Sequence, residues 1–254
     1  MPSPHPLPHT RTPCLLFTTA VAASRYVARE IDKLVRARNA VGKPTVLGLA
    51  TGSTPVGLYR ELIRLHKDEG LDFSQVVTFN LDEYFPMPKE DSHSYFRWMH
   101  ETFFNHVNIR WQNIHIPDGT LPVEEVDGFC AEYERKIKAA GGVDIQILGI
   151  GRTGHIGFNE PGSPKNSRTR MVTLDSITRR ASRMVATPIV IAWFGTFSSP
   201  KNPLAASRRV MLSSVTRRVR LFRGLPGSLK PMCPVRPMPR IWMSMPPAAR
   251  IFRS

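Results

Sequence analysis

The sequence predicts an α/β protein with three layers, in which a mainly parallel, open sheet carries helices on both faces. Segments with apolar residues at helical spacing alternate with short apolar runs along most of the chain. Each short run ends at a loop of small or polar residues, as strands of such sheets commonly do. The chain has 254 residues, which is enough to bury a substantial core. Alternating strands and helices favour parallel strands joined by helical crossovers.

The first part of the chain supplies two helices and two strands. Residues 24–38 place apolar side chains at helical spacing between Arg, Glu and Lys, which predicts an amphipathic helix. The apolar run 44–49 predicts a strand, and the Gly-, Ser- and Thr-containing stretch 50–56 predicts the loop after it. Residues 57–67 repeat the helical spacing, and the apolar run 76–81 predicts a buried strand.

The same alternation continues to about Arg180. Residues 95–106 predict a helix rich in aromatic side chains, and residues 126–140 predict another amphipathic helix. The apolar run 143–150 predicts a third strand. After Arg180 the alternation stops. The apolar run 187–197 can form a strand, but the many prolines beyond it prevent a long helix or a central strand.

The net charge of +15 is distributed unevenly, because residues 180–254 contain 14 Lys and Arg but no Asp or Glu. Residues 1–179 contain 21 Lys and Arg and all 20 acidic residues, so this part is nearly neutral. The contrast indicates two compositions joined near Arg180, and not one basic nucleic-acid-binding domain. We therefore expect a non-native or disordered N-terminus at 1–19, a folded domain at 20–179 and an aberrant basic tail at 180–254.

Composition also disfavours several classes of protein. No run of 18 apolar residues exists, so no membrane-spanning helix is predicted. The apolar stretch near the N-terminus is too short and interrupted for a signal peptide. The three cysteines, Cys14, Cys130 and Cys233, lack metal-binding spacing, so free thiols in a cytoplasmic chain are the simplest interpretation. We expect no metal, no membrane and no nucleic acid as partners.

The loop 50–55 lies between a predicted strand and a predicted helix. Gly52 lets the backbone approach a ligand closely, and the hydroxyls of Ser53 and Thr54, with N–H groups at a helix N-terminus, suit a phosphate. This is not a Walker A loop, because no Gly-Lys-Ser/Thr follows. The alternative is an ordinary turn in which Ser or Thr caps the helix.

Two adjacent acids, Asp82 and Glu83, follow the predicted strand 76–81. In open α/β sheets, ligands bind beyond the carboxyl ends of the strands. A carboxylate placed there can act as general base toward a proton α to a carbonyl group. The alternative is that Asp82 caps the next turn and Glu83 is solvated.

The segment 148–161 contains the spacing Gly-x-Gly-x-x-Gly after a predicted strand. The glycines and prolines that follow break the helix that a dinucleotide site needs, so this match carries little weight. His155 and Glu160 are more informative, because a carboxylate near a histidine can hold one tautomer and raise its basicity. The alternative is a surface histidine with an unrelated glutamate.

Taken together, these segments resemble the glucosamine-6-phosphate deaminase family in their order and spacing. The matching segments are LGLATGSTPVGLY (47–59), VVTFNLDEY (76–84), HSYFRWMHETFF (93–104), NIHIPDGT (113–120), LGIGRTGHIGFNEPGS (148–163) and SRTRMVTLDSITR (167–179). The resemblance covers about residues 24–179. It implies the deaminase/ribose-phosphate isomerase/CoA-transferase-like fold and the conversion of glucosamine 6-phosphate to fructose 6-phosphate and ammonia. It also implies a small-molecule sugar phosphate as partner, no cofactor, and a homo-oligomer if the fold is complete.

The resemblance implies roles for particular residues. His155 would be the ring-opening acid–base group, supported by Glu160, and Asp82 the base that moves a proton between C2 and C1. Thr153, placed with the substrate-binding residues, stands where many members have Asp, and a hydroxyl cannot orient an imidazolium as a carboxylate does. The residues that resemble the phosphate-side loop are Gly52, Ser53 and Thr54. The residues that resemble an effector-phosphate site are Ser163, Arg168 and Arg170.

The resemblance stops after residue 179. There the family supplies an Arg and a Lys-bearing turn that bind the substrate phosphate, and neither is found here; residues 206–212 resemble only the strand before that turn. An Arg-, Pro- and Ser-rich stretch without acids is typical of a GC-rich gene translated out of frame, so we expect 180–254 to be a frameshift product or a sequencing error. A sheet without its last strands exposes apolar edges, and the loss of two cations predicts weak or absent catalysis.

Three other functions stay open. The chain could be a phosphogluconolactonase-like hydrolase on the same fold, or a catalytically inactive protein that binds a sugar phosphate. It could also bind nucleic acid through 180–254. The pairing of NLDEY with GHIGFNEP favours the deaminase over the first of these alternatives.

Overall fold

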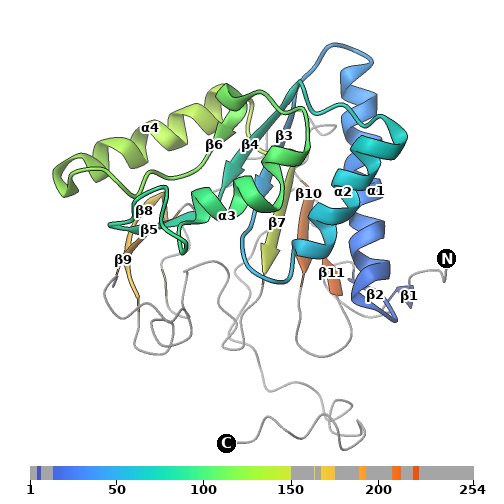
Figure 1. Ribbon diagram of the computed structural model, residues 1–254, viewed down its shortest axis with the longest axis horizontal. Coiled ribbons are helices and arrows are strands. Elements are labelled where there is room, and N and C mark those ends of the chain that lie inside the picture. Colours follow the sequence, from blue (N-terminus) through green and yellow to red (C-terminus); the bar gives the residue numbers. More distant parts are fainter. Residues whose placement is uncertain are drawn as a thin grey trace, which may run out of the picture.

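The computed structural model describes residues 5–6, 14–149, 163 and 167–174, together with the strands at 189–192, 208–212 and 220–222 (Figure 1). The central sheet has five strands, and each is parallel to its neighbours. In order across the sheet they are β10 (Arg208–Leu212), β7 (Ile145–Gly149), β3 (Thr45–Leu49), β4 (Val76–Asn80) and β6 (Ile114–His115). The predicted mainly parallel sheet is therefore confirmed.

The order of the strands reverses once along the chain. From β3 the chain passes to β4 and β6 on one side, and it then returns to the other side of β3 for β7 and β10. The carboxyl ends of β3 and β7 consequently lie side by side at the point of reversal. Ligands of open α/β sheets bind at such a switch point, so the fold itself indicates where a site is expected.

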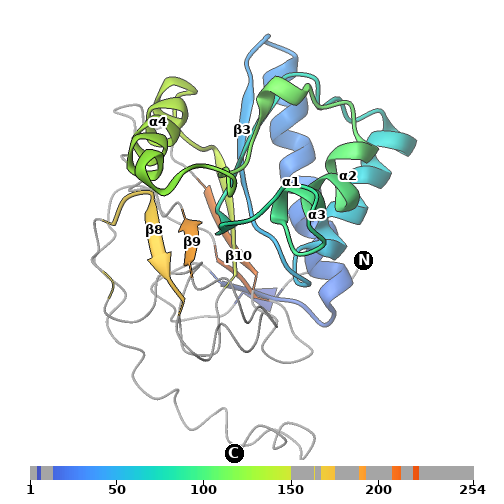
Figure 2. The same ribbon diagram turned by 60° about the vertical axis from the view of Figure 1, so that its left-hand side comes forward.

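Helices cover both faces of the sheet. Figure 2 shows α1 (Ala20–Asn39), α2 (Val56–Glu69) and α3 (Tyr95–Thr102) on one face and α4 (Val126–Ala139) on the opposite face. The short 3-10 helices are η1 (Phe104–His106), η2 (Trp111–Asn113) and η3 (Val123–Glu125). This arrangement confirms the expected three layers.

Two helix boundaries differ from the sequence prediction for local reasons. α1 begins before residue 24, because the Thr19 hydroxyl accepts a hydrogen bond from the Ala22 amide at 3.1 Å and so caps the helix. The predicted helix 95–106 is interrupted at Phe103, whose φ of −142° leaves the helical range. The chain then continues as η1.

A second, antiparallel sheet adjoins the central one. β5 (Asp82–Phe85) starts two residues after the end of β4 and pairs with β9 (Ile189–Ala192), which pairs in turn with β8 (Arg170–Thr173). The strand predicted within 187–197 is thereby confirmed. Asp82 and Arg170 both pair in register with Ala192, so their backbones are about 10 Å apart across the sheet.

β10 corrects one expectation about the end of the chain. It pairs with β7 from Arg208 opposite Ile145 to Leu212 opposite Gly149. A strand within 206–212 therefore covers the edge of β7 that a sheet lacking its last strands would leave open. The paired strand satisfies backbone groups of β7 that an edge strand would expose.

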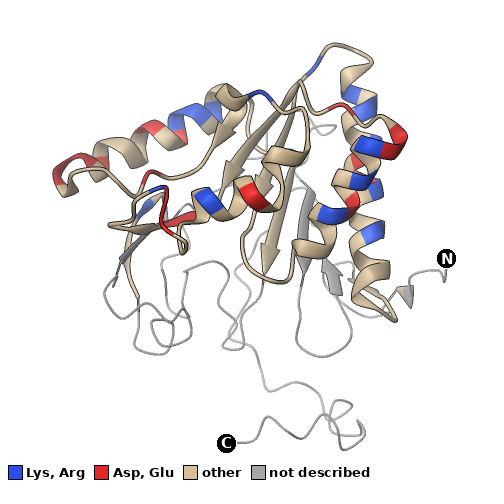
Figure 3. Cartoon of the chain, viewed as in Figure 1, with Lys and Arg blue, Asp and Glu red and all other residues tan. Residues whose placement is uncertain are grey.

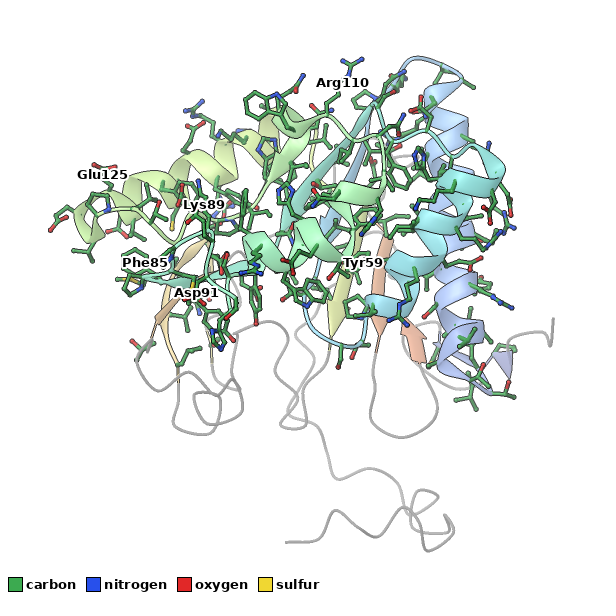
Figure 4. All side chains as sticks on the ribbon, viewed as in Figure 1. Tyr59, Phe85, Lys89, Asp91, Arg110 and Glu125 are labelled. Carbon is green, nitrogen blue, oxygen red and sulfur yellow. The ribbon has the colours of Figure 1, made fainter. Side chains whose placement is uncertain are left out.

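The main core lies where the helices pack on the central sheet. Tyr59, labelled in Figure 4, is fully buried and stacks on Phe103 with ring centroids 5.0 Å apart. On the face toward α4, Phe79 meets the Tyr133 ring edge to face at 5.6 Å. Burial of these large aromatic side chains removes apolar area from water and is the main favourable contribution to folding.

Part of the N-terminal stretch belongs to this folded unit. β2 (Cys14–Leu16) pairs antiparallel with β1 (His5–Pro6) and with β11 (Arg220–Phe222). Phe17 is only 4% exposed and joins the main core. Its burial accounts for the order at the end of the 1–19 segment. The domain boundaries themselves stay a prediction.

Charged residues of both signs are mixed along the helices (Figure 3). Glu69 on α2 pairs with Arg29 on α1 at 2.5 Å and with Arg64 on its own helix at 2.9 Å. The mixture agrees with the nearly neutral composition of residues 1–179. No helix in the described part of the chain combines the length and apolar character needed to cross a membrane.

Candidate active site

Two of the three sequence-predicted segments meet beside the switch point. The loop 50–55 leaves β3, and Asp82 follows the neighbouring strand β4. β7 ends at Gly149 on the other side of β3, and the segment 150–162 begins there. Thr153, His155 and Glu160 lie in that segment, outside the described residues, so their placement stays a prediction.

Asp82 is a buried carboxylate at the first position of β5. Its side chain hydrogen-bonds to that of Thr51 from the loop after β3, which ties the two segments together. Within the described residues, no group hydrogen-bonds to Asp82 Oδ1. An unpaired carboxylate oxygen away from water is costly, and such atoms persist where a ligand or a reaction uses them.

The surroundings of Asp82 shift its protonation into the neutral range. Burial disfavours the ionised form and the negative charge of Glu83 adds to this, while the Thr51 hydrogen bond opposes both; the net effect raises the pKa of Asp82 to about 7. At neutral pH the group is therefore present in both forms. A carboxyl group with this pKa can accept a proton from carbon and return it, as general acid–base catalysis requires.

Tyrosines from three helices surround this carboxylate. The hydroxyl of Tyr95 lies 3.1 Å from that of Tyr84, and the Tyr95 side chain also hydrogen-bonds to Thr51. Burial first, and then the charge of Asp82, raise the pKa of Tyr95 well above its usual value. The same two causes raise the pKa of Tyr59 and of Tyr133. These phenols stay neutral at physiological pH and can donate hydrogen bonds.

Asn80 is a second buried residue whose side chain carries unpaired polar atoms among the described residues. It ends β4, two residues before Asp82, and neither atom of its amide group has a hydrogen-bond partner within the described residues. Its backbone carbonyl accepts a hydrogen bond from the Tyr133 hydroxyl at 2.8 Å. Sequence reasoning did not select Asn80, Thr51 or Tyr95, although each lies in a segment that carried the resemblance.

The loop 50–55 has the features expected of an anion site. Gly52 has a φ of +93°, a left-handed conformation that favours glycine, and no atom blocks the position of a Cβ there. Ser53 is exposed and Thr54 is half-buried. Pro55 stands at the N-cap of α2, and no side chain caps this helix. The alternative of a Ser or Thr cap is thus not what the structure has, and the N–H groups of the first turn can bind an anion.

Glu83 is not the solvated side chain of the alternative interpretation. It is 2% exposed and accepts hydrogen bonds from the backbone of Tyr95 and Phe96 at the start of α3. Burial raises the pKa of Glu83, and these hydrogen bonds oppose the shift. Asp82 likewise is not the N-cap of the next described helix, α3, because Ser94 is.

The residues expected at an effector-phosphate site lie on and before β8. Ser163 is half-buried, and the Arg168 guanidinium pairs with Glu134 of α4 at 2.8 Å. Arg170 is half-buried, and burial lowers the pKa of its guanidinium. Their role stays a prediction. Among the described residues, no cluster of His, Cys, Asp and Glu could hold a metal ion.

Comparisons with known proteins agree with this geometry. Residues 18–192 match the model of the family described as glucosamine-6-phosphate isomerases/6-phosphogluconolactonase. A glucosamine-6-phosphate deaminase of Halothermothrix orenii is 44% identical over 200 residues, which are 77% of this chain and 82% of that protein. One from Alkaliphilus oremlandii is 51% identical over 146 residues, 57% of this chain. A solved structure of a monomeric glucosamine-6-phosphate deaminase superposes with a TM-score of 0.67 at 37% identity, covering 76% of this chain and 78% of that one.

The matched regions differ in length between relatives. The chain spans 60% of the length of the Alkaliphilus oremlandii protein and 82% of the length of the Halothermothrix orenii protein. The family match includes the loop 50–55, Asp82 and the segment after β7, and it runs through β9. A match over residues 18–192 covers more than half of the chain. The chain belongs to the family of glucosamine-6-phosphate isomerases and 6-phosphogluconolactonases.

Proposed function

We propose that the chain is an enzyme of amino-sugar catabolism that converts glucosamine 6-phosphate and water to fructose 6-phosphate and ammonia. The observation that carries the proposal is Asp82, a buried carboxyl group with a pKa of about 7 at the carboxyl end of a central strand, one of whose oxygens has no hydrogen-bond partner among the described residues. The 44% identity to a glucosamine-6-phosphate deaminase over most of that protein's length supports the choice of substrate.

The proposed reaction needs a base that handles a carbon-bound proton. Ionised Asp82 would take the proton from C2 of the open-chain sugar and deliver it to C1, while a proton of the substrate's own amino group passes to O1. The product carries an imine at C2 beside a hydroxyl at C1. The C2 amine leaves as ammonia after water adds to the carbon that carried it. The substrate's own carbonyl group stabilises the intermediate, so no cofactor enters the proposal.

The remaining roles follow the residues that the family resemblance selected. His155, supported by Glu160, would open the sugar ring by moving a proton between the ring oxygen and O1. Thr153 would contact the substrate beside His155. The N–H groups at the start of α2, with the residues Gly52, Ser53 and Thr54, would bind the phosphate. The effector role of Ser163, Arg168 and Arg170 belongs to the same proposal.

The proposal places the reaction in the cytoplasm, where reduced cysteines such as Cys14 and Cys130 are stable. The family resemblance implies a homo-oligomer for a complete fold, whereas the relative with a TM-score of 0.67 is described as monomeric. Size-exclusion chromatography with light scattering decides between one copy and several.

A comparison of substrates tests the proposed reaction. The purified full chain is incubated with glucosamine 6-phosphate or with a phosphogluconolactone, and ammonia, fructose 6-phosphate and lactone hydrolysis are measured. The expected result is ammonia and fructose 6-phosphate in equal amounts from the amino sugar. Hydrolysis of the lactone without ammonia release from the amino sugar would assign the chain to the hydrolase alternative.

A further inference from the structure

We propose that Glu83 is a positioning residue for Asp82: its buried carboxylate joins the start of β5 to the first turn of α3 and thereby fixes the Asp82 carboxylate in the site. The kinetic part of this inference rests on the proposed function, since it concerns the rate of proton transfer at Asp82. The structural part does not, because it concerns contacts and protonation that are measurable without turnover.

The contacts of Glu83 use both oxygens of its carboxylate. Oε1 accepts the amides of Tyr84 and Tyr95, each at 2.9 Å. Oε2 accepts the amide of Phe96 at 2.8 Å and the hydroxyl of Ser94 at 2.9 Å. Four donors converge on one side chain that is 2% exposed. Removing any single acceptor would leave buried donors unpaired, which is costly.

These bonds complete the N-terminus of α3. The first N–H groups of a helix have no partner within it. Glu83 accepts those of Tyr95 and Phe96, while the Ser94 hydroxyl accepts that of Arg97 at 3.4 Å. The next amide, that of Trp98, already bonds to the Ser94 carbonyl at 3.0 Å. Glu83 of β5 thus accepts hydrogen bonds from the N–H groups at the start of α3, and these bonds hold the strand and the helix together.

The alternation of side chains along β5 connects this joint to Asp82. Neighbouring residues of a strand point to opposite faces, so Asp82 and Tyr84 share a face and Glu83 points to the other. Tyr84 contacts the hydroxyl of Tyr95 at 3.1 Å, and Tyr95 hydrogen-bonds to Thr51, which also bonds to Asp82. The amides of Tyr95 and Phe96 bond to Glu83 on one face of β5. These bonds therefore fix the position of the Tyr95 ring, which lies near Asp82 on the other face.

The charge of Glu83 acts on Asp82 as well. The groups that hydrogen-bond to the Glu83 carboxylate among the described residues are all donors, and three of them lie at the positive end of α3, so the ionised form is the one that fits. This charge is a cause of the raised pKa of Asp82, second to burial. Within the described part of the chain, the other titratable groups whose pKa responds to the charge of Asp82 are phenols, namely Tyr59 on α2, Tyr95 on α3 and Tyr133 on α4. Among described residues, Glu83 is therefore the charged neighbour of Asp82.

Two variants and one control separate position from charge. Glu83→Gln keeps the size of the side chain but removes the charge and turns one acceptor into a donor. Glu83→Asp keeps the charge but shortens the side chain. The control, Glu101→Gln, removes a carboxylate from α3. The Glu101 side chain is 60% exposed and pairs with Arg97 at 2.7 Å. The full chain of each is compared by carbon-13 NMR titration of its carboxyl groups and by the pH dependence of deamination.

The expected results differ for each variant. Glu83→Gln lowers the pH at which Asp82 titrates and moves the acid limb of kcat/KM in the same direction. Both Glu83 variants lower kcat by about 10- to 100-fold, because a small displacement of a catalytic group is enough for such a loss. Glu83→Asp leaves the Asp82 titration close to that of the parent, and Glu101→Gln changes neither quantity.

Titration of the parent chain tests the inference even if the Glu83 variants do not fold. As pH falls, Asp82 must take up its proton at a higher pH than Glu83 does; the reverse order would overturn the proposal. An unchanged Asp82 titration in folded Glu83→Gln would overturn it too. A parent chain without deaminase activity would refute the proposed function alone, since both titrations would still be read.

Discussion

Asp82 loses most of its contact with water when the chain folds, and Glu83 then lies beside it with a second negative charge. Both effects favour the protonated form, so the pKa of Asp82 rises to about 7 from an unfolded value of about 4. Between these values the folded state binds a proton that the unfolded state does not. Stability contributed by this group consequently falls as pH rises from about 4 to 7.

This linkage predicts a gain in stability for Asp82→Asn. A neutral amide avoids the cost of ionisation, so we expect the free energy of unfolding at pH 8 to rise by on the order of 2–4 kcal/mol. The gain should shrink as pH falls toward 4, where the parent carboxyl group is protonated in both states. Urea denaturation at pH 4.5, 6 and 8 measures it. A variant less stable than the parent at pH 8 would contradict the assigned environment.

Thr51 provides a prediction of opposite sign to that for Glu83. Its hydrogen bond lowers the pKa of Asp82, so Thr51→Val should raise that pKa and move the acid limb of kcat/KM to higher pH. Thr120→Val is the matched control, because Thr120 bonds at 2.7 Å to Asp118, a carboxylate outside the site. The measurement is the pH dependence of kcat/KM for the parent, Thr51→Val and Thr120→Val. A shift to lower pH in Thr51→Val would refute the contact.

Sequence reasoning found Asp82 and Gly52 because each stands directly after a strand, in a position that the fold class marks. It missed Thr51, Tyr95 and the role of Glu83, because these depend on contacts between segments far apart in sequence. Glu83 and Tyr95 are twelve positions apart in the sequence. No periodicity of the sequence indicates that the N-terminus of the helix packs back onto the strand. Such contacts need the tertiary structure.

Helices and strands were predicted well where their own residues decide them. The strand 76–81 and the helix 126–140 agree with β4 and α4, since apolar spacing reports directly which face is buried. The end of α3 was not predicted, because Phe103 leaves the helix to pack against Tyr59 of α2. Tertiary packing overrides local propensity at that point.

The close approach of β3 to β7 gives a testable prediction about how these two strands pack. The Gln146 side chain lies where a Cβ at Gly48 would be and donates to the Ile147 carbonyl at 2.9 Å. Gly48→Ala should therefore destabilise the protein by about 1–3 kcal/mol, because a buried side chain must move. Gly128→Ala, at an exposed position of α4 with no atom within 4 Å of the new Cβ, should stabilise the protein by about 0.5–1 kcal/mol.

Thermal or urea unfolding of both alanine variants gives the comparison. Both changes add one methyl group, so their difference reports the space at each position and not the chemistry of the substitution. Equal stability of Gly48→Ala and Gly128→Ala would contradict the packing of β3 against β7.

At the scale of the whole molecule, composition separated residues 1–179 from an acid-free remainder, and the family match through residue 192 extends somewhat past that division. The reversal of strand order between β3 and β7 could not be predicted, because it depends on which strands pair. The Arg and the Lys-bearing turn expected beyond residue 179 were not found in the sequence. We therefore expect weak binding of the substrate phosphate and slow turnover.

The central claim is that Asp82 moves the proton in a deamination reaction. Its direct test is the initial rate of ammonia release from glucosamine 6-phosphate between pH 5 and 9, for the full chain and for Asp82→Asn. We expect a slow but measurable rate in the parent, with kcat/KM rising to a plateau above about pH 7, where the carboxylate is ionised. We expect Asp82→Asn to be at least about 100-fold slower at every pH. Equal rates for the two proteins would contradict the account.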